Sequence, residues 1–332
     1  MPEIRQNIAT KEWVIIATER AKRPEEFSSK GHSRTEDRPE LIEKCPFCPG
    51  NETKTPPETF RISRNSQWRV RVIPNKFAAL QQEGERKRTI KGVERSMSGV
   101  GIHEVIIETP LHNKTTALLS TQEVTDIINA YRNRHETISS DPRIELVIIF
   151  KNHGESAGTS LEHPHSQLIA TPIVPSQIRH RLEDALVFSD DYGQCVYCQM
   201  LRDELNEKIR LIEENDYFAA FILYAAASPF HIWIMPKRHM ACFSLITDEE
   251  TSALAATLGS VLKKLYYGLG DPDFNYVIRS VPIGLKTAPY FHWYLSIVPR
   301  LSKAAGFELG SGMFINTSLP EQSAEFLRGI NC

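Results

Sequence analysis

The chain has 332 residues, 41% hydrophobic and 24% charged, a composition typical of a globular protein with one large or two medium cores. Its 39 Lys and Arg against 41 Asp and Glu give a formal charge of -2, which excludes an overall basic field for a nucleic-acid backbone. The N-terminus lacks the apolar core of a secretory signal, and no apolar run approaches the roughly 20 residues of a membrane span. We therefore expect a cytoplasmic protein that binds neither nucleic acid nor membrane.

The same order of elements occurs twice along the chain. The first copy runs through Cys45-x-x-Cys48, a strand-like stretch ending at His112, a helix behind the capping box Ser120-x-x-Glu123, an apolar strand at 144–150, and His163. The second copy runs through Cys195-x-x-Cys198, a strand-like stretch ending at His239, a helix behind Thr247-x-x-Glu250, a strand at 274–280, and His292. The two histidines of each copy are 51 and 53 residues apart. The sequence therefore predicts two copies of one α+β unit.

The boundaries of the two units follow from the polar segments between them. Residues 180–194 include many acidic and polar residues, as a boundary segment does. We therefore expect one domain over residues 1–179 and a second over 180–332. Residues 28–42 and 82–98 are polar and weakly periodic, which predicts loops. In the second unit one helical face is apolar and should pack on a sheet; its residues are Leu254, Leu258, Val261, Leu262 and Leu265.

Each unit offers the four ligands of a tetrahedral zinc site. A Cys-x-x-Cys turn places two thiolates on one ion, and two histidines complete the set. We expect one Zn²⁺ at Cys45, Cys48, His112 and His163, and another at Cys195, Cys198, His239 and His292, so two per chain. A buried pair or a redox dithiol is the alternative for either cysteine pair taken alone. His103 and His231 are competing ligands, but each stands at the far end of its strand, too distant to share the ion.

His165 is the candidate nucleophile. It stands two residues after the expected metal ligand His163 in the segment His-Pro-His-Ser-Gln. A metal ion bound by His163 would therefore fix the backbone beside His165. The preceding loop, residues 152–160, contains Gly154 and Gly158, which allow backbone N–H groups to approach a phosphate closely. A neutral imidazole is a suitable nucleophile toward phosphorus. The alternative for His-x-His alone is two more metal ligands or two surface histidines.

Two further residues refine this hypothesis. Gln167 can donate an amide hydrogen to a phosphoryl oxygen but cannot supply a proton, which favours transfer over hydrolysis. In the second unit Tyr294 stands where the nucleophile would be, so one active centre per chain is expected.

The chain resembles the galactose-1-phosphate uridylyltransferase family, the transferase branch of the histidine-triad superfamily, whose relatives include ADP-glucose phosphorylases. The segments that carry the resemblance are RAKRP at 20–24, CPFC, VIPNKFAAL at 72–80, TPLHNK at 109–114, NHGESAGTSLEHPHSQ at 152–167 and GFELGSGMFIN at 306–316. It implies two tandem histidine-triad-like units, each a mostly antiparallel sheet with packed helices. It also implies a homodimer whose sites are completed across the interface.

The resemblance also implies a ping-pong reaction. His165 would take a nucleotide from a nucleoside-diphosphate sugar, and a sugar 1-phosphate or phosphate would then accept it. The implied substrate contacts are Arg20, Arg23, Asn75, Asn152, Gly158, Ser160 and Gln167. Two guanidinium groups suit a pyrophosphate because each can bind it through two hydrogen bonds.

Two features depart from the well-studied uridylyltransferases. Lys76 replaces an acidic residue, and the segment 306–316 looks closer to the ADP-glucose phosphorylases. The second metal site is shared with only part of the family, so its ion is either zinc or iron.

We expect a UDP-glucose–hexose-1-phosphate uridylyltransferase of galactose metabolism, with ADP-glucose phosphorylase as the alternative. A nucleotide hydrolase is disfavoured by Gln167. A zinc-ribbon-like binding module is disfavoured by the balanced charge and the large duplicated core.

Overall fold

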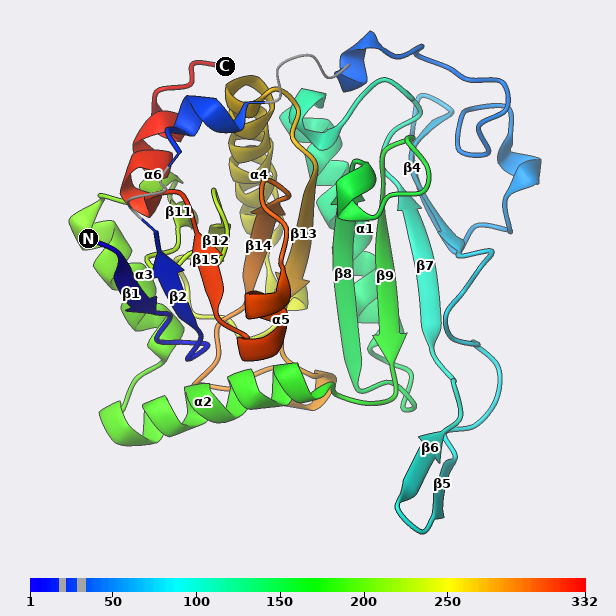
Figure 1. The fold of residues 1–332 in the computed structure, drawn as a ribbon. Helices are drawn as coiled ribbons and strands as arrows, with labels where there is room; N and C mark the ends of the chain where they lie inside the picture. Colours follow the sequence, from blue (N-terminus) through cyan, green and yellow to red (C-terminus); the bar gives the residue numbers. More distant parts are fainter. Residues whose placement is uncertain (18–21, 29–33) are drawn as a thin grey trace.

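The computed structural model describes residues 1–17, 22–28 and 34–332 and has one large sheet at its centre (Figure 1). Ten strands in the order β10-β11-β12-β14-β13-β8-β9-β7-β4-β3 form this sheet, and all neighbours are antiparallel. The first unit contributes β3 (Phe60–Arg64), β4 (Gln67–Pro74), β7 (Ile102–Ile107), β8 (Leu146–His153) and β9 (His165–Thr171). The second contributes β10 (Leu211–Glu214), β11 (Phe218–Ile222), β12 (Ile232–Pro236), β13 (Phe274–Arg279) and β14 (Tyr294–Pro299).

The two units share this sheet through the pairing of β8 with β13. Phe274 lies opposite His153, and Ile278 lies opposite Ile149. The expected α+β fold with two units of the same element order is confirmed. The continuous sheet was not predicted, and it brings the start of β13 beside the end of β8, where the glycine-containing loop begins.

Two helices pack against each other on one face of the sheet. They are α1 (Thr121–Ile138) and α4 (Asp248–Leu269), and both begin at the predicted capping boxes. The five apolar residues predicted to form one face of α4 are all buried. The other helices are α2 (Ser176–Tyr192), α3 (Val196–Glu207), α5 (Gly306–Ser311) and α6 (Pro320–Arg328). Among residues 1–17, 22–28 and 34–332, no helix has both the length and the apolar character needed to cross a membrane.

Two smaller sheets stand apart from the main one. The segment 82–98, expected to be a loop, contains the hairpin of β5 (Arg88–Lys91) and β6 (Glu94–Met97), which projects from the body (Figure 1). Its charged residues hide the alternation that marks a half-buried strand. A three-stranded sheet joins the ends of the chain: β1 (Glu3–Gln6), β2 (Trp13–Ile16) and β15 (Phe314–Asn316). Short 3₁₀ helices occur at η2 (Pro24–Phe27), η3 (Thr35–Asp37), η4 (Glu52–Lys54), η5 (Thr116–Leu118), η6 (Glu155–Ala157), η7 (Phe243–Leu245) and η8 (Ile283–Leu285).

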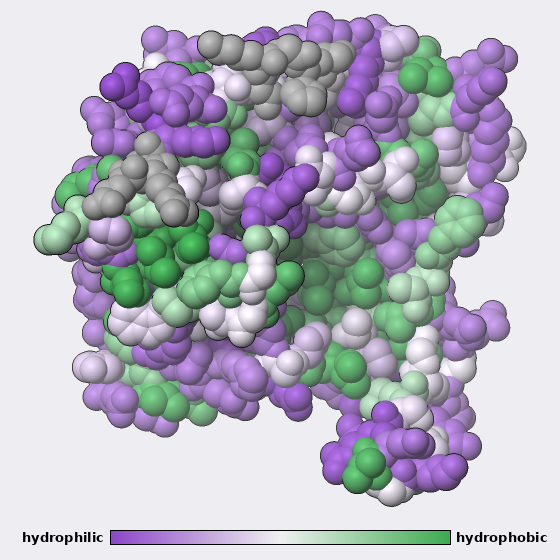
Figure 2. Space-filling model, viewed as in Figure 1, coloured by the Kyte–Doolittle hydropathy of each residue, from purple (hydrophilic) through white to green (hydrophobic). Residues whose placement is uncertain are grey.

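The face of the sheet that is turned away from α1 and α4 is hollowed over its central strands. Figure 2 shows this hollow with an apolar wall, partly covered by the segment of α5 and β15. A small cavity opens there between α2 and the ends of β13 and β14. Its lining includes Ile148, Ile278, Phe291 and Tyr294.

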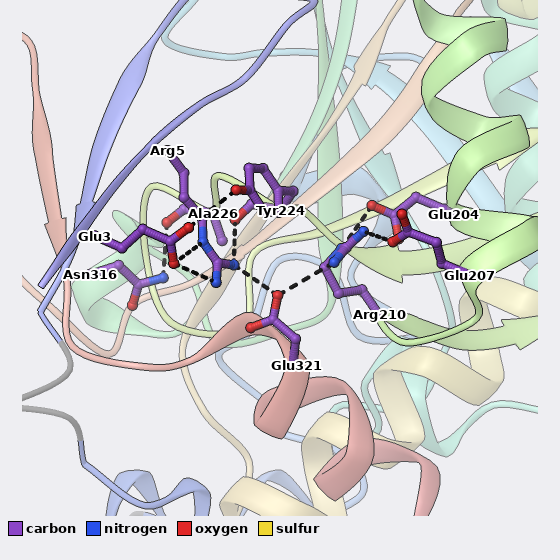
Figure 3. A network of polar contacts seen from close by, with 9 residues as sticks. All are labelled: Glu3, Arg5, Glu204, Glu207, Arg210, Tyr224, Ala226, Asn316 and Glu321. Carbon is purple, nitrogen blue, oxygen red and sulfur yellow. Dashed lines mark hydrogen bonds and ion pairs between the residues drawn. The ribbon is translucent and has the colours of Figure 1, made fainter. Parts of the chain in front are cut away.

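A polar network fastens both chain ends to the second unit (Figure 3). Arg5 on β1 donates to Glu321 on α6 at 2.8 Å and to the backbone carbonyl of Tyr224 at 3.1 Å. Glu321 also lies 3.4 Å from Arg210, which donates to Glu204 on α3 at 2.9 Å. Buried carboxylates need such partners because removal of either charge leaves the other uncompensated. The network therefore fixes β1 and α6. It also fixes the three-stranded sheet of β1, β2 and β15, and β15 is the end of the 306–316 segment.

His135 on α1 should make the free energy of unfolding depend on pH in the acidic range. Burial lowers the pKa of His135 to about 4, so it stays neutral in the folded protein while it is protonated in the unfolded chain below about pH 6.5. Stability should therefore fall as the pH decreases from 6.5 to 4. We predict that His135→Leu loses about 2 to 3 kcal/mol less free energy of unfolding between pH 7 and 4.5 than the wild type does. Urea denaturation at each pH measures this. Equal losses in both proteins would contradict the prediction.

Candidate active site and metal centres

The first cysteine pair and two histidines form a compact, buried cluster. The ligand atoms of Cys45, Cys48, His112 and His163 all lie within 4.8 Å of one another. Cys45 and Cys48 precede β3, His112 follows β7, and His163 lies just before β9. The sequence predicted this set, and the structure brings all four together.

The spacing and chemistry of this cluster fit a tetrahedral zinc ion. The Sγ of Cys48 lies 3.6 Å from the Nδ1 atoms of both His112 and His163, and the Sγ of Cys45 lies 3.7 Å from His163 Nδ1. With Zn–S of about 2.3 Å and Zn–N of about 2.0 Å, tetrahedral angles require S···N distances of about 3.5 Å, close to those observed. His163 Nε2 lies 2.8 Å from the carbonyl oxygen of Thr109, where it donates its hydrogen and leaves Nδ1 free for the metal.

The second cluster is looser. Cys195, Cys198 and His239 lie within the same 4.8 Å limit, and Cys198 is partly exposed. His292, the fourth expected ligand, is outside that group, although its Nδ1 lies 3.4 Å from Cys198 Sγ. The structure thus brings three predicted ligands together and places the fourth beside one of them.

His165 is the first residue of β9 and is 7% exposed. Its Nδ1 lies 2.8 Å from the carbonyl oxygen of His163, an acceptor, so Nδ1 carries the hydrogen and Nε2 keeps its lone pair. Burial lowers the pKa of His165, which favours the neutral ring. Phe47, between the two cysteines, contacts the rings of both His163 and His165 edge-on. The imidazole is therefore fixed, neutral and has a free nitrogen lone pair.

A cleft of ≈ 850 Å³ opens in front of His165. Its walls come from the loop after β8, from the start of β9, and from residues that precede β13 and follow β14. The predicted residues among its lining are Asn152, Ser160, His163 and His165. The wall carries Arg38, Arg300 and Lys303 together with the carboxylates Glu155, Glu162, Asp271 and Asp273. Lys151 also reaches the wall, but its ammonium is paired with Glu108. Arg38, Arg300 and Lys303 are therefore the cations available to an anionic ligand.

The glycine-containing loop owes its shape to aspartates of the second unit. Asp273 accepts from both the backbone N–H and the hydroxyl of Ser156, and Asp271 accepts from His153 at 2.8 Å. Gly154 has φ +85°, and a Cβ atom there would lie 1.7 Å from Asp273 Oδ1. Only glycine can hold this turn so close to the carboxylate. The shared sheet is what supplies these contacts.

Gln167 is oriented by a histidine whose role the sequence did not reveal. His103 Nδ1 accepts from the N–H of Ala79 at 3.1 Å, so its Nε2 carries the hydrogen and donates to Gln167 Oε1 at 2.8 Å. Asn75 Nδ2 lies 3.1 Å from the same nitrogen. His103 is thus remote from the metal cluster, as its spacing suggested, and it leaves the Gln167 NH₂ group free to donate elsewhere.

The remaining expected contacts do not line the cleft as far as the described residues show. Arg20 lies outside the described residues, and Arg23 is exposed at the start of η2. The cleft wall does not include Asn75, Gly158 or Gln167. Gly158 is adjacent in sequence to Thr159, and Thr159 does line the cleft. The sequence missed Arg38, Arg300 and Lys303, because each is a lone basic residue with no motif around it.

The equivalent place in the second unit has no nucleophile. Tyr294 is 1% exposed and stacks on Trp233 with ring centroids 3.9 Å apart. Its hydroxyl accepts from Arg181 at 3.3 Å. The Tyr294 side chain is therefore packed among buried aromatic rings.

Two family models together match almost the entire chain. The N-terminal domain model of galactose-1-phosphate uridyl transferase matches residues 1–175, and the C-terminal domain model matches residues 176–327. The chain belongs to the galactose-1-phosphate uridyl transferase family and is therefore a nucleotidyltransferase.

Individual relatives in this family match over nearly full length. An ADP-glucose phosphorylase of Arabidopsis thaliana is 36% identical over 99% of this chain and 93% of its own. A galactose-1-phosphate uridylyltransferase of Thermotoga maritima is 27% identical over 99% of this chain and 98% of its own. A crystal structure of the Arabidopsis thaliana ADP-glucose phosphorylase with bound ADP-glucose has a TM-score of 0.84 at 33% identity, covering 100% of this chain and 99% of that one.

The Gly154 turn gives a test of the loop geometry. We predict that Gly154→Ala costs about 1 to 3 kcal/mol in free energy of unfolding, because it adds both backbone strain and a clash with Asp273. It should also speed hydrogen exchange at the amides of Ala157 and Thr159, which bond to the Gly154 carbonyl. Gly193→Ala is the control, since Gly193 also has positive φ but has open space around it. If the two variants lose equal stability and the loop exchange is unchanged, the close approach has no consequence.

Proposed function

We propose that the protein is an ADP-glucose phosphorylase, which transfers an adenylyl group from ADP-glucose to inorganic phosphate. The observation that carries this proposal is the 36% identity to an ADP-glucose phosphorylase, against 27% to a uridylyltransferase over the same share of the chain. The departures at Lys76 and in the segment 306–316 support the same choice. ADP-glucose phosphorylase, the alternative from the sequence, is therefore favoured over the uridylyltransferase.

His165 is the proposed nucleophile. Its Nε2 lone pair attacks the α-phosphorus, a P–N bond forms, and the bond from that phosphorus to the bridging oxygen breaks. Glucose 1-phosphate leaves with the electron pair of that bond. In the second half of the reaction, a phosphate oxygen attacks the same phosphorus and the P–N bond breaks, which releases ADP and restores His165. Throughout, Nδ1 keeps its hydrogen and donates it to the carbonyl oxygen of His163.

The surrounding groups bind and polarise the phosphates in this proposal. Asn152 and Ser160 line the cleft beside His165, and the free amide hydrogens of Gln167 would stabilise charge on a non-bridging oxygen. Arg20, Arg23, Asn75 and Gly158 are proposed as further substrate contacts on the strength of the family resemblance.

Zinc is the proposed metal of the first cluster, held by Cys45, Cys48, His112 and His163. With four protein ligands and no open position, a zinc ion would fix the backbone at His163 and take no part in the chemistry. We propose a second ion at Cys195, Cys198 and His239, with His292 as the nearest candidate for the fourth position.

Product analysis tests the choice of substrate. We predict that the enzyme with ADP-glucose and inorganic phosphate yields ADP and glucose 1-phosphate faster than UDP-glucose and galactose 1-phosphate yield UDP-galactose. Chromatographic separation of the nucleotides measures both reactions in parallel. His165→Ala should abolish either reaction. A faster uridylyl exchange would replace the phosphorylase by the uridylyltransferase, and nucleoside monophosphate as the main product would indicate a hydrolase.

Metal analysis tests the two clusters separately. We predict about two metal ions per chain, one of which is lost in Cys45→Ser/Cys48→Ser and the other in Cys195→Ser/Cys198→Ser. The first pair should lower transfer more, since His163 is two residues from His165 and coordinates the same ion as Cys45 and Cys48. Plasma mass spectrometry counts the ions. A metal-free wild-type chain that folds and turns over normally would contradict both assignments.

A further inference from the structure

A buried ion pair lies directly behind His165. Lys151 on β8 and Glu108 after β7 have side chains 1% and 0% exposed, and the ammonium donates to Glu108 Oε2. Burial by itself raises the pKa of Glu108, but the Lys151 ammonium and further hydrogen bonds outweigh this effect and hold the pKa below its ordinary value. A buried pair of this kind is seldom a net source of stability, because both charges lose their hydration. Its presence beside the cleft therefore calls for another explanation.

The pair and its partners contact three consecutive residues around the nucleophile. The backbone N–H of Glu108 donates to the carbonyl of Pro164 at 3.2 Å. Lys151 Nζ lies 3.5 Å from the carbonyl oxygen of His165. The hydroxyl of Tyr131 lies 3.2 Å from Glu108 Oε1 and 2.7 Å from the hydroxyl of Ser166.

The preceding residue is held as well. His163 belongs to the metal cluster and donates to the carbonyl of Thr109, the residue next to Glu108. Each residue from 163 to 166 thus has its own contact. For residues 164, 165 and 166 that contact is with Glu108, with Lys151, or with a hydroxyl bonded to Glu108.

The second unit supplies an internal comparison. Ile106 pairs with Ser166 in the first unit as Ile234 pairs with Leu295 in the second, so Glu108 corresponds to Pro236. By the same register Lys151 corresponds to Ile278, which pairs with Leu295. All three second-unit residues are buried. The unit that has Tyr294 in place of the nucleophile therefore has apolar residues in place of Glu108, Lys151 and Ser166.

We propose that the side chains of Glu108 and Lys151 are positioning residues for nucleotidyl transfer, which fix residues 165 and 166 so that His165 Nε2 points at the α-phosphorus. The bond from the Glu108 backbone to Pro164 is independent of the side chain and remains in every variant. The inference rests on the proposed role of His165. In-line attack requires the nitrogen and the phosphorus to be about 3 to 3.5 Å apart and aligned with the leaving oxygen. A displacement of about 1 Å from a change away from the reacting atoms can cost on the order of 100-fold in rate.

The test replaces the pair by apolar residues, as the second unit does. Glu108→Met/Lys151→Met removes both charges together, so neither is left unpaired, and folding should be preserved. We predict that the rate at which ADP-glucose labels His165 in a single turnover falls on the order of 10- to 100-fold, while the dissociation constant for ADP-glucose changes less than about threefold. Rapid quench measures the rate, and calorimetry on His165→Ala backgrounds measures the binding.

The matched control is another buried ion pair that starts on β7. Glu104 accepts two hydrogen bonds from Arg134 at 2.8 and 2.9 Å, and neither residue contacts 163–166. Glu104→Met/Arg134→Met should label at the wild-type rate. If both double variants lose the rate equally, or if neither does, Glu108 and Lys151 have no positioning role.

Tyr131→Phe decides the question should a double variant fail to fold. It removes only the hydroxyl that joins Glu108 to Ser166. Tyr197→Phe is its control, because it removes a buried tyrosine hydroxyl that has no hydrogen-bond partner among the described residues. Slower labelling in Tyr131→Phe alone supports the proposal, and equal rates overturn it. A wild-type chain that never labels His165 would instead refute the proposed function, an outcome separate from these.

Discussion

The candidate active site depends on the two-residue spacing between His163 and His165. His163 belongs to a buried cluster whose S···N distances of 3.6 to 3.7 Å match those around a tetrahedral zinc ion. Its carbonyl oxygen accepts the Nδ1 hydrogen of His165, so the backbone fixed by the cluster also selects the tautomer of the neighbouring imidazole. A cluster suited to a structural metal ion and the proposed nucleophile therefore share one short segment. The metal would act on the chemistry through position alone.

The shared ten-stranded sheet supplies the other half of the site. Because β8 pairs with β13, the aspartates at 271 and 273 reach the glycine-containing loop of the first unit and hold its backbone in the shape that residues 152–160 adopt. The second unit has Tyr294 at the position of the proposed nucleophile and apolar residues at the positions of the buried polar groups, yet it forms one wall of the cleft. One unit thus carries the proposed chemistry and the other supports it.

The sequence predicted what short-range patterns encode. Cys-x-x-Cys pairs, matched histidine spacings and capping boxes identified the first cluster, three members of the second, and the two helices α1 and α4. It missed features that depend on contacts between distant segments. The bond from His103 to Gln167 joins residues 64 positions apart in the sequence, and the Asp271–His153 contact exists only because two strands more than 100 residues apart are paired. The hairpin at 88–97 was missed because its charged residues obscure strand alternation.

The most direct test of the account is the mass of the protein after incubation with ADP-glucose in the absence of phosphate. The account predicts that the wild-type chain gains one adenylyl group, that peptide mapping places it on His165, and that later addition of phosphate removes it as ADP. A wild-type chain that turns over ADP-glucose without gaining mass, or a His165→Ala variant that is adenylylated to the same extent, would contradict it.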